Sequence, residues 1–105
     1  MEISDLRSAV SAGRISWRQH TLKRMLERNI PRKNVIDVIG YGEIIEEYPL
    51  ARPCPSCLIL GLSDNVVYHV VVAYDLSEKM VYVITVYEPD ESHFMADFKT
   101  RKKDK

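Results

Sequence analysis

The apolar residues of the first forty positions recur at the spacing of three and four residues that is typical of amphipathic helices. We expect the first helix to be capped at Ser4 and to end at Gly13, because a serine hydroxyl satisfies helix amides and glycine accepts the backbone conformation that follows a helix. One face of this helix is apolar and consists of Ile3, Leu6, Ala9 and Val10. The pattern predicts that this face packs on a core.

Two further helices are predicted before residue 43. Residues 16–19 read Ser16-Trp17-Arg18-Gln19, which has the form of a capping box, so we expect the second helix to start there. Its apolar stripe comprises Leu22, Met25 and Leu26. Pro31 marks the break before a third helix, which Gly40-Tyr41-Gly42 ends. The core positions of the third helix are Val35, Ile36, Val38 and Ile39.

From Glu43 onward the pattern changes to the alternation of strands. Strands are predicted at residues 43–48, 57–62, 66–74 and 80–87, because these runs are rich in β-branched and aromatic residues and are separated by turn-like segments. Three prolines make the segment after Tyr48 an irregular loop. Short connections favour antiparallel neighbours. The predicted fold is therefore α+β, with N-terminal helices packed on one face of an antiparallel sheet of about four strands.

The composition fits one globular domain. The chain has 105 residues, of which 46% are hydrophobic and 29% charged. We expect residues 1–98 to form a single domain and the basic residues 99–105 to form a flexible tail. The longest uncharged apolar runs fall far short of the roughly 20 residues of a membrane span. Acidic residues occupy the N-terminal positions where a secretory signal is basic, so a cytoplasmic location without membrane attachment is predicted.

Charge is strongly segregated along the chain, although 15 basic and 15 acidic residues balance overall. Residues 14–33 hold seven basic residues and one acidic residue, whereas residues 34–98 hold two basic and eleven acidic residues. A basic face of this kind predicts binding to RNA or to an acidic partner, and a solvated helix surface is an equally simple interpretation. The candidate RNA-binding residues are Arg18, Lys23, Arg24, Arg28, Arg32 and Lys33.

Two sets of residues are candidates for acid–base chemistry. His20 and Arg24 share one face of the second helix, where an imidazole could move a proton beside a guanidinium that holds phosphate. An exposed row of polar side chains is the alternative interpretation. In the strand at 66–74, His69 lies on the face of Val67, Val71 and Ala73. Strict alternation puts Val81, Val83, Thr85 and Tyr87 on one face of the next strand. Tyr87 could then complete a small cleft with His69, unless His69 is simply a satisfied core residue.

Cys54 and Cys57 have the spacing of a redox dithiol or of half a zinc site. A redox pair usually precedes a helix, whereas these cysteines precede a predicted strand. A zinc ion would need two more ligands, and the three histidines lie in separate segments. A zinc or redox protein is therefore the weaker alternative.

Five segments together resemble the domain-of-unknown-function family DUF4258. They are His20-x-x-x-Arg24-Met25-x-x-Arg28-x-Ile30 after Trp17, Gly42-x-Ile44-Ile45-Glu46-x-Tyr48, Pro55-Ser56-Cys57-Leu58-x-Leu60-Gly61, His69-Val70-Val71-Val72 and Thr85-Val86-Tyr87-x-Pro89-Asp90. Such domains are similar to the RelE/ParE-like toxin superfamily. The resemblance implies a RelE-like fold, a metal-independent endoribonuclease, and an antitoxin partner, often one with a YgiT-type zinc finger. It also implies a shared site at His20, Arg24, His69 and Tyr87.

The resulting hypothesis is an mRNA interferase that needs no cofactor. His20 and His69 would carry the protons, Arg24 with Arg28 would stabilise the phosphate, and Tyr87 would orient or stack on a base. Glu46 is a further candidate for the general base. RelE-like sites are usually rich in basic residues on the sheet, whereas the strand region here is acidic, so the second helix would have to hold the RNA. The rival hypothesis is a non-catalytic module that binds protein or nucleic acid through the basic helix face.

Overall fold

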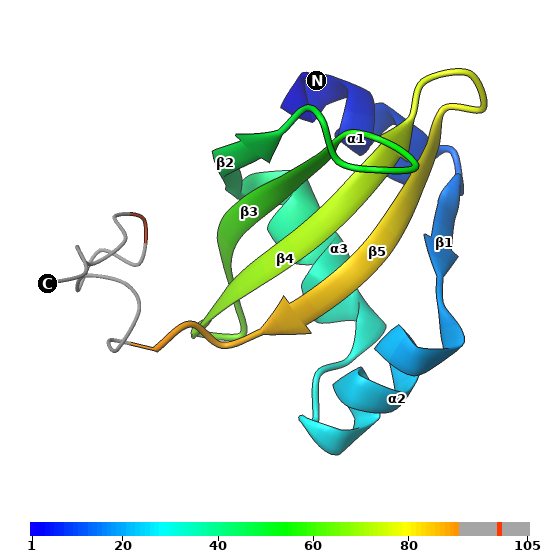
Figure 1. The fold of residues 1–105 in the computed structure, drawn as a ribbon. Coiled ribbons are helices and arrows are strands. Elements are labelled where there is room, and N and C mark those ends of the chain that lie inside the picture. The colour runs from blue at the N-terminus through cyan, green and yellow to red at the C-terminus, as the bar shows by residue number, and fades with distance from the viewer. Residues whose placement is uncertain (91–98, 100–105) are drawn as a thin grey trace, which may run out of the picture.

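The computed structural model describes residues 1–90 and residue 99. These residues form an α+β fold in which three helices accompany one five-stranded sheet (Figure 1). The helices are α1 (Ile3–Ser11), α2 (Gln19–Glu27) and α3 (Arg32–Tyr41). The strands are β1 (Ile15–Trp17), β2 (Glu43–Tyr48), β3 (Ser56–Ser63), β4 (Val66–Asp75) and β5 (Met80–Tyr87). The predicted α+β class is confirmed, with one strand more than expected.

Apart from Lys99, the basic tail expected at residues 99–105 lies outside the described residues. Within the described part of the chain, α3 is the longest helix and has 10 residues. No helix there is both long enough and apolar enough to cross a membrane.

The sheet is mixed rather than purely antiparallel. Its strand order is β1-β5-β4-β3-β2, and the four strands from β2 to β5 pair antiparallel, as the short connections predict. The additional strand β1 pairs parallel with β5, with Ile15 opposite Val81 and Trp17 opposite Val83. Three residues are too few to show an alternating pattern, so this strand had no signal in the sequence.

The expected capping box at residues 16–19 does not form, and that prediction was wrong. Ser16 lies in β1, opposite Tyr82 of β5, and α2 begins only at Gln19. Because Ser16 and Trp17 pair with β5, they do not form the start of the helix that the local motif predicts. The second helix is accordingly shorter than predicted.

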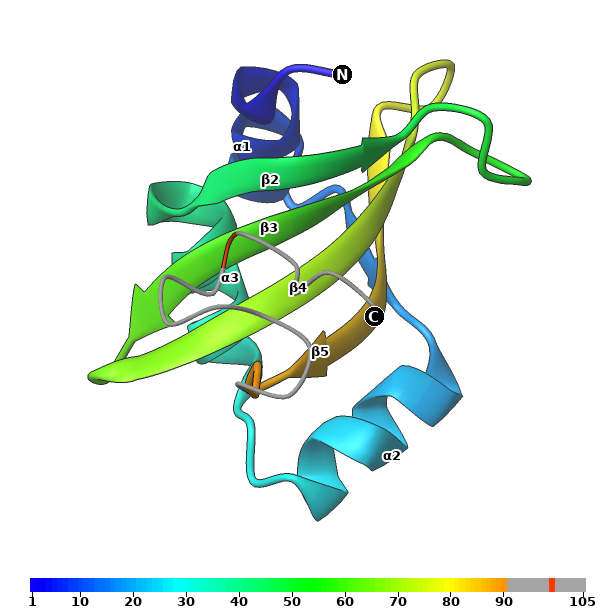
Figure 2. The same cartoon turned by 60° about the vertical axis from the view of Figure 1, so that its left-hand side comes forward.

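Helices α1 and α3 cover one face of the sheet, and Figures 1 and 2 show α3 behind the central strands. The core between them contains Leu6, Ala9, Val35, Val38, Ile39, Cys57, Ile59, Tyr68, Val70, Val72, Val81 and Val83. Two predicted core positions were wrong: Ile36 is 41% exposed and Leu26 is 80% exposed. On α2 the buried positions are Met25, as predicted, and Thr21, because this helix packs beside β5 rather than over the sheet.

The end of α3 is held tightly against the sheet. The Arg7 guanidinium donates hydrogen bonds to the carbonyl oxygens of Ile39 and Gly42, at 3.0 and 2.8 Å, which satisfies groups that the helix end leaves unpaired. A Cβ atom at Gly42 would lie 2.4 Å from two backbone oxygens, and one at Gly61 would lie 2.9 Å from Val38. These two glycines allow α3 and β3 to approach closely.

A β-bulge changes the faces of β5. Val71 pairs with Thr85 and Val72 pairs with Val83, so Ile84 is the extra residue. Val81 and Val83 therefore face the helices, whereas Thr85 and Tyr87 face the opposite side. The prediction that all four share one face was wrong, because strict alternation has no allowance for an inserted residue.

Candidate functional site

The sheet face opposite α1 and α3, called here the helix-free face, carries most of the polar side chains that could do chemistry. Alternation in β4 sends Tyr68, Val70, Val72 and Tyr74 to the helices, and His69 with Val67, Val71 and Ala73 to the helix-free face, as predicted. On β5 the bulge brings Tyr87 to the same face. Alternation along β4 thus determines the face on which His69 lies, and the bulge in β5 determines that Tyr87 lies beside it.

His69 and Tyr87 are direct cross-strand partners. The His69 Nδ1 atom lies 3.4 Å from the Tyr87 hydroxyl oxygen, and the two rings meet edge to face with centroids 5.4 Å apart. His69 is fully buried, whereas Tyr87 is only half-buried. This is a long hydrogen bond, of the kind that often shortens when a substrate binds. The pair can pass a proton between a buried imidazole and a phenol at the surface.

Glu46 lies on the same face and belongs to a second polar pair. The Tyr48 hydroxyl donates a short hydrogen bond to the Glu46 carboxylate. Glu46 is opposite Leu58 on β3, and Leu58 is opposite Val71 on β4, so two strand spacings, roughly 10 Å, separate Glu46 from the β4 backbone. Glu46 shares the face with His69 but is not its neighbour in the sheet.

A hollow of about 660 Å³ lies on the helix-free face beneath the loop that joins β2 and β3. Its polar lining comes from several elements and consists of Arg18, Tyr48, Arg52, Cys54, Ser56, Asp75 and Tyr82. Val71, Ala73 and Ile84 provide its apolar floor on β4 and β5. Of these residues only Arg18 was predicted to bind RNA. The contribution of Arg52, Tyr48 and Tyr82 was missed, because the folding of the loop over the sheet has no local signal.

His20 and Arg24 lie apart from this arrangement, exposed on α2. The helix is anchored to β5 by other residues: Thr21 Oγ1 donates to the Ile84 carbonyl oxygen at 2.9 Å, and Arg28 Nη1 donates to the Val86 carbonyl oxygen at 2.7 Å. No hydrogen bond between described residues joins His20 or Arg24 to the His69–Tyr87 pair. The structure therefore brings together His69 and Tyr87, with Glu46 on the same face, and leaves His20 and Arg24 on the outer helix surface.

The predicted RNA-binding residues divide into engaged and available groups. Arg28 bonds to β5, the Arg32 guanidinium lies 5.7 Å from the Trp17 ring centroid, and the Lys33 ammonium lies 3.1 Å from Asp37 and 3.6 Å from Asp64. A hydrogen bond and the charge of Asp37 raise the pKa of Lys33. The available members, which are exposed and have no such partner among the described residues, are Arg18, Lys23 and Arg24.

The two cysteines are free thiols with different surroundings. Cys54 is half-buried in the β2–β3 loop, whereas Cys57 is fully buried on the helix side of β3. Burial, assisted by the charge of Glu47, raises the pKa of Cys57 to about 12. A thiol with this pKa is not ionised at neutral pH, which disfavours Cys57 as a redox nucleophile. Residues 1–90 and 99 contain no group of three or more side chains placed to hold a metal ion.

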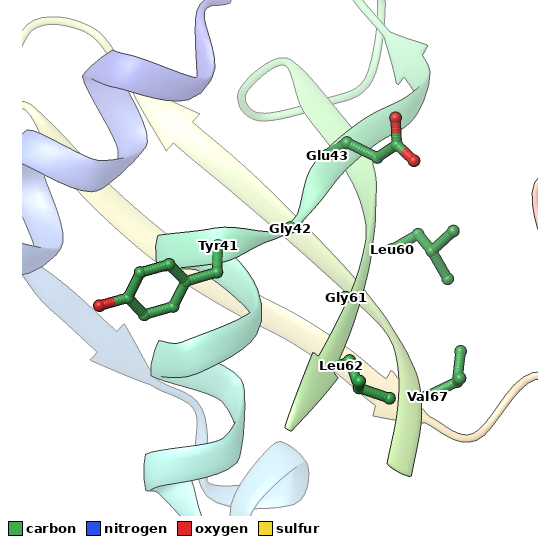
Figure 3. A pocket seen from close by; sticks show the side chains of 7 residues that line it. All are labelled: Tyr41, Gly42, Glu43, Leu60, Gly61, Leu62 and Val67. Carbon is green, nitrogen blue, oxygen red and sulfur yellow. The ribbon is translucent and has the colours of Figure 1, made fainter. Parts of the chain in front are cut away.

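A second hollow, of about 400 Å³, lies where α3 ends and β2 begins (Figure 3). Leu60, Leu62 and Val67 give it a mainly apolar lining, and its Tyr41 is 88% exposed. The Glu43 carboxylate at its rim is paired with Lys99 at 2.6 Å. This hollow lacks the proton-transferring pair of the helix-free face, so the latter is the better candidate site.

Comparison with known protein families gives one match. The model of the domain of unknown function DUF4258 matches residues 17–88, a span that includes α2, all of β2 to β5, and each candidate catalytic residue. Comparisons with curated proteins and with solved structures return no significant match. The match covers well over half of the chain, and the chain belongs to the DUF4258 family.

Proposed function

We propose that this chain is a RelE-like, metal-independent endoribonuclease, the toxin of a toxin–antitoxin pair that acts on cytoplasmic mRNA. The observation that carries the proposal is the His69–Tyr87 pair on the helix-free face, where one partner is buried and the other reaches the surface. The Arg28 guanidinium lies beside this pair, because its Nη1 donates a hydrogen bond to the carbonyl oxygen of Val86, the residue before Tyr87. A proton-transferring pair beside a cation is the minimum that metal-free cleavage of a phosphodiester requires.

In this mechanism the ribose 2′-hydroxyl gives its proton to the His69–Tyr87 pair and attacks the adjacent phosphorus. A bond from the 2′-oxygen to phosphorus forms, the bond to the 5′-oxygen breaks, and the pair returns a proton to the leaving oxygen. Tyr87 is the group that touches the RNA, because it is only half-buried whereas His69 is fully buried. His69 acts through Tyr87 as a positioning residue and proton partner. The phosphate charge is held by Arg28, whose guanidinium bonds through Nη1 to the carbonyl oxygen of Val86, the residue before Tyr87, and keeps further N–H donors for the phosphate.

The experiment is cleavage of single-stranded RNA by the purified full chain. Tyr87→Phe and His69→Asn are each expected to lower the cleavage rate by about 10²-fold or more, as loss of a general acid or base does. Tyr41→Phe is the matched control, because it removes the same hydroxyl from an exposed tyrosine elsewhere. Chelator is expected to have no effect. Cleavage that survives both site substitutions contradicts the mechanism, and cleavage abolished by His20→Ala alone moves the site to α2.

A non-catalytic binding module is the second candidate. The observation that favours it is the group of exposed cations on and before α2, Arg18, Lys23 and Arg24, which have no ion pair with a described residue. RNA binding that weakens steeply with salt, without any cleavage, would support this function. Growth inhibition on expression that a protein encoded by a neighbouring gene relieves would support the toxin and identify its antitoxin, including one with a YgiT-type zinc finger.

A further inference from the structure

We propose that the hollow beneath the β2–β3 loop binds one nucleotide of the RNA, at a subsite separate from the point of cleavage. The inference rests on the proposed function for the class of its ligand, a single-stranded RNA. It adds a subsite, with Arg18 and Arg52 on the phosphate and the Tyr82 ring against the base.

The two arginines give the hollow its capacity for an anion. Arg18 comes from the segment between β1 and α2, and Arg52 from the loop, so they approach the hollow from different elements. Both are exposed, and neither guanidinium makes a hydrogen bond or ion pair with another described residue. In the Asp75 carboxylate of the lining, Oδ1 accepts hydrogen bonds from the Ser77 amide and hydroxyl, at 2.9 and 2.7 Å, and these contacts lower the pKa of Asp75. Among the described residues Asp75 makes no ion pair with either arginine, so both guanidinium groups can bind a phosphate.

The two tyrosines give the hollow flat apolar surfaces. Tyr48 is opposite Ser56, and Ala73 is opposite both Ser56 and Tyr82, so a single row across the sheet has a ring at each end and small residues between. Each hydroxyl is tied to a carboxylate, Tyr48 to Glu46 and Tyr82 to Glu78. These bonds restrict the rings, and stacking on such a ring is tolerant of base identity.

The loop over the hollow is tied to the sheet before any ligand arrives. The Tyr74 amide donates to the Pro55 carbonyl oxygen at 3.0 Å, and the Ala51 amide donates to the Tyr48 carbonyl oxygen at 3.2 Å. Prolines at positions 49, 53 and 55 restrict its backbone further. The volume of about 660 Å³ falls within the range of roughly 300–1,000 Å³ that is usual for small-ligand sites. A preformed hollow loses little entropy on binding.

The hollow lies along β4 from the catalytic pair. Val71 and Ala73, in its floor, lie two and four residues from His69 on β4, which is roughly 7 and 13 Å along the strand. An RNA strand that runs along β4 would place one nucleotide in the hollow and a neighbouring nucleotide at Tyr87.

The test is binding of a short, uncleavable single-stranded RNA with 2′-O-methyl riboses, measured by fluorescence anisotropy on the full chain. Arg52→Ala is expected to weaken binding about tenfold and to reduce the salt dependence of the logarithm of affinity by about 0.7. Tyr82→Leu is expected to weaken it about fivefold or more, and Tyr82→Phe, which keeps the ring but loses the bond to Glu78, to weaken it less. Lys79→Gln is the matched control, since it removes a positive charge from the exposed β4–β5 turn outside the hollow.

Cleavage assays separate this inference from the proposed function. With cleavable RNA, Arg52→Ala is expected to raise KM and leave kcat unchanged. If the hollow variants bind RNA more weakly but the wild type does not cleave it, the subsite is supported and the proposed endoribonuclease activity is contradicted. If neither Arg52→Ala nor Tyr82→Leu changes cleavage or binding, the proposed endoribonuclease stands and the subsite is overturned. The subsite is also overturned if the wild type does not bind the uncleavable strand.

Discussion

The two faces of β4 differ in what they contribute, although they share one backbone. Toward the helices, Val70 and Val72 are fully buried in an apolar core. On the helix-free face, His69 is equally buried but bonds to a tyrosine, and the neighbouring Val71 lines the floor of a hollow. One face is therefore built for stability, and the other places polar groups at fixed positions on a rigid support. Substitutions confined to one face test this difference.

The largest effect is expected at the close approach on the helix-covered face. Gly42→Ala would put a Cβ atom 2.4 Å from the backbone oxygens of Leu60 and Val38, neither of which can rotate away. We expect a loss of about 3 kcal/mol in the free energy of unfolding, measured by urea denaturation. Gly40→Ala is the matched control. Its Cβ meets nothing within 4 Å, so this helical position is expected to gain about 0.5–1 kcal/mol. Equal effects at the two glycines would contradict the close approach.

A smaller effect separates the two faces directly, at adjacent positions of β4. Val72→Ala removes two methyl groups from the core and leaves a cavity, so we expect a loss of about 2 kcal/mol in the free energy of unfolding. Val71→Ala removes the same groups from a half-buried position on the helix-free face, where about 1 kcal/mol or less is expected. Similar losses at both positions would mean that the helix-free face supports the fold as much as the core does.

Local sequence patterns were sufficient for the long strands. The predicted bounds of β2 and β5 agree with the structure, and β3 and β4 are longer than predicted by one or two residues. β-Branched and aromatic runs between turn residues carry this information locally. The strand β1 was missed because its conformation depends on pairing with β5, sixty-six residues away in the chain at Ile15 and Val81.

The candidate site was predictable only in part, for the same reason. Alternation along β4 was enough to assign the face of His69. The register that makes Tyr87 the partner of His69 depends on the bulge at Ile84, and no residue type in the sequence indicates this bulge. The hollow requires the β2–β3 loop to fold back over β4 and β5. The presence of Arg52 and Tyr82 in one lining therefore depends on tertiary structure and has no local sequence signal. Helix periodicity placed His20 and Arg24 together, but it carried no information on where α2 lies relative to the sheet.

The smallest effect concerns a polar contact at the edge of the helix-covered face. The Ser63 hydroxyl donates to Asp37 Oδ2 at 2.7 Å, and this bond, followed by the one from Lys33, lowers the pKa of Asp37. A carboxylate whose pKa is lower in the folded state contributes stability above its unfolded pKa, near 4, and that contribution is lost as the pH falls through the folded value. The Asp37 side chain is 32% exposed, so the contribution is small.

Ser63→Ala removes the largest cause of that shift, so it is expected to reduce the loss of stability between about pH 5 and pH 3. The measurement is the urea midpoint at each pH for wild type, Ser63→Ala, Asp37→Asn and the double variant. Because other carboxylates titrate in the same window, only the difference between the variants isolates this pair. In the Asp37→Asn background, Ser63→Ala should leave the pH dependence unchanged. A change of equal size in both backgrounds would show that the Ser63 hydroxyl affects the pH dependence through some group other than Asp37.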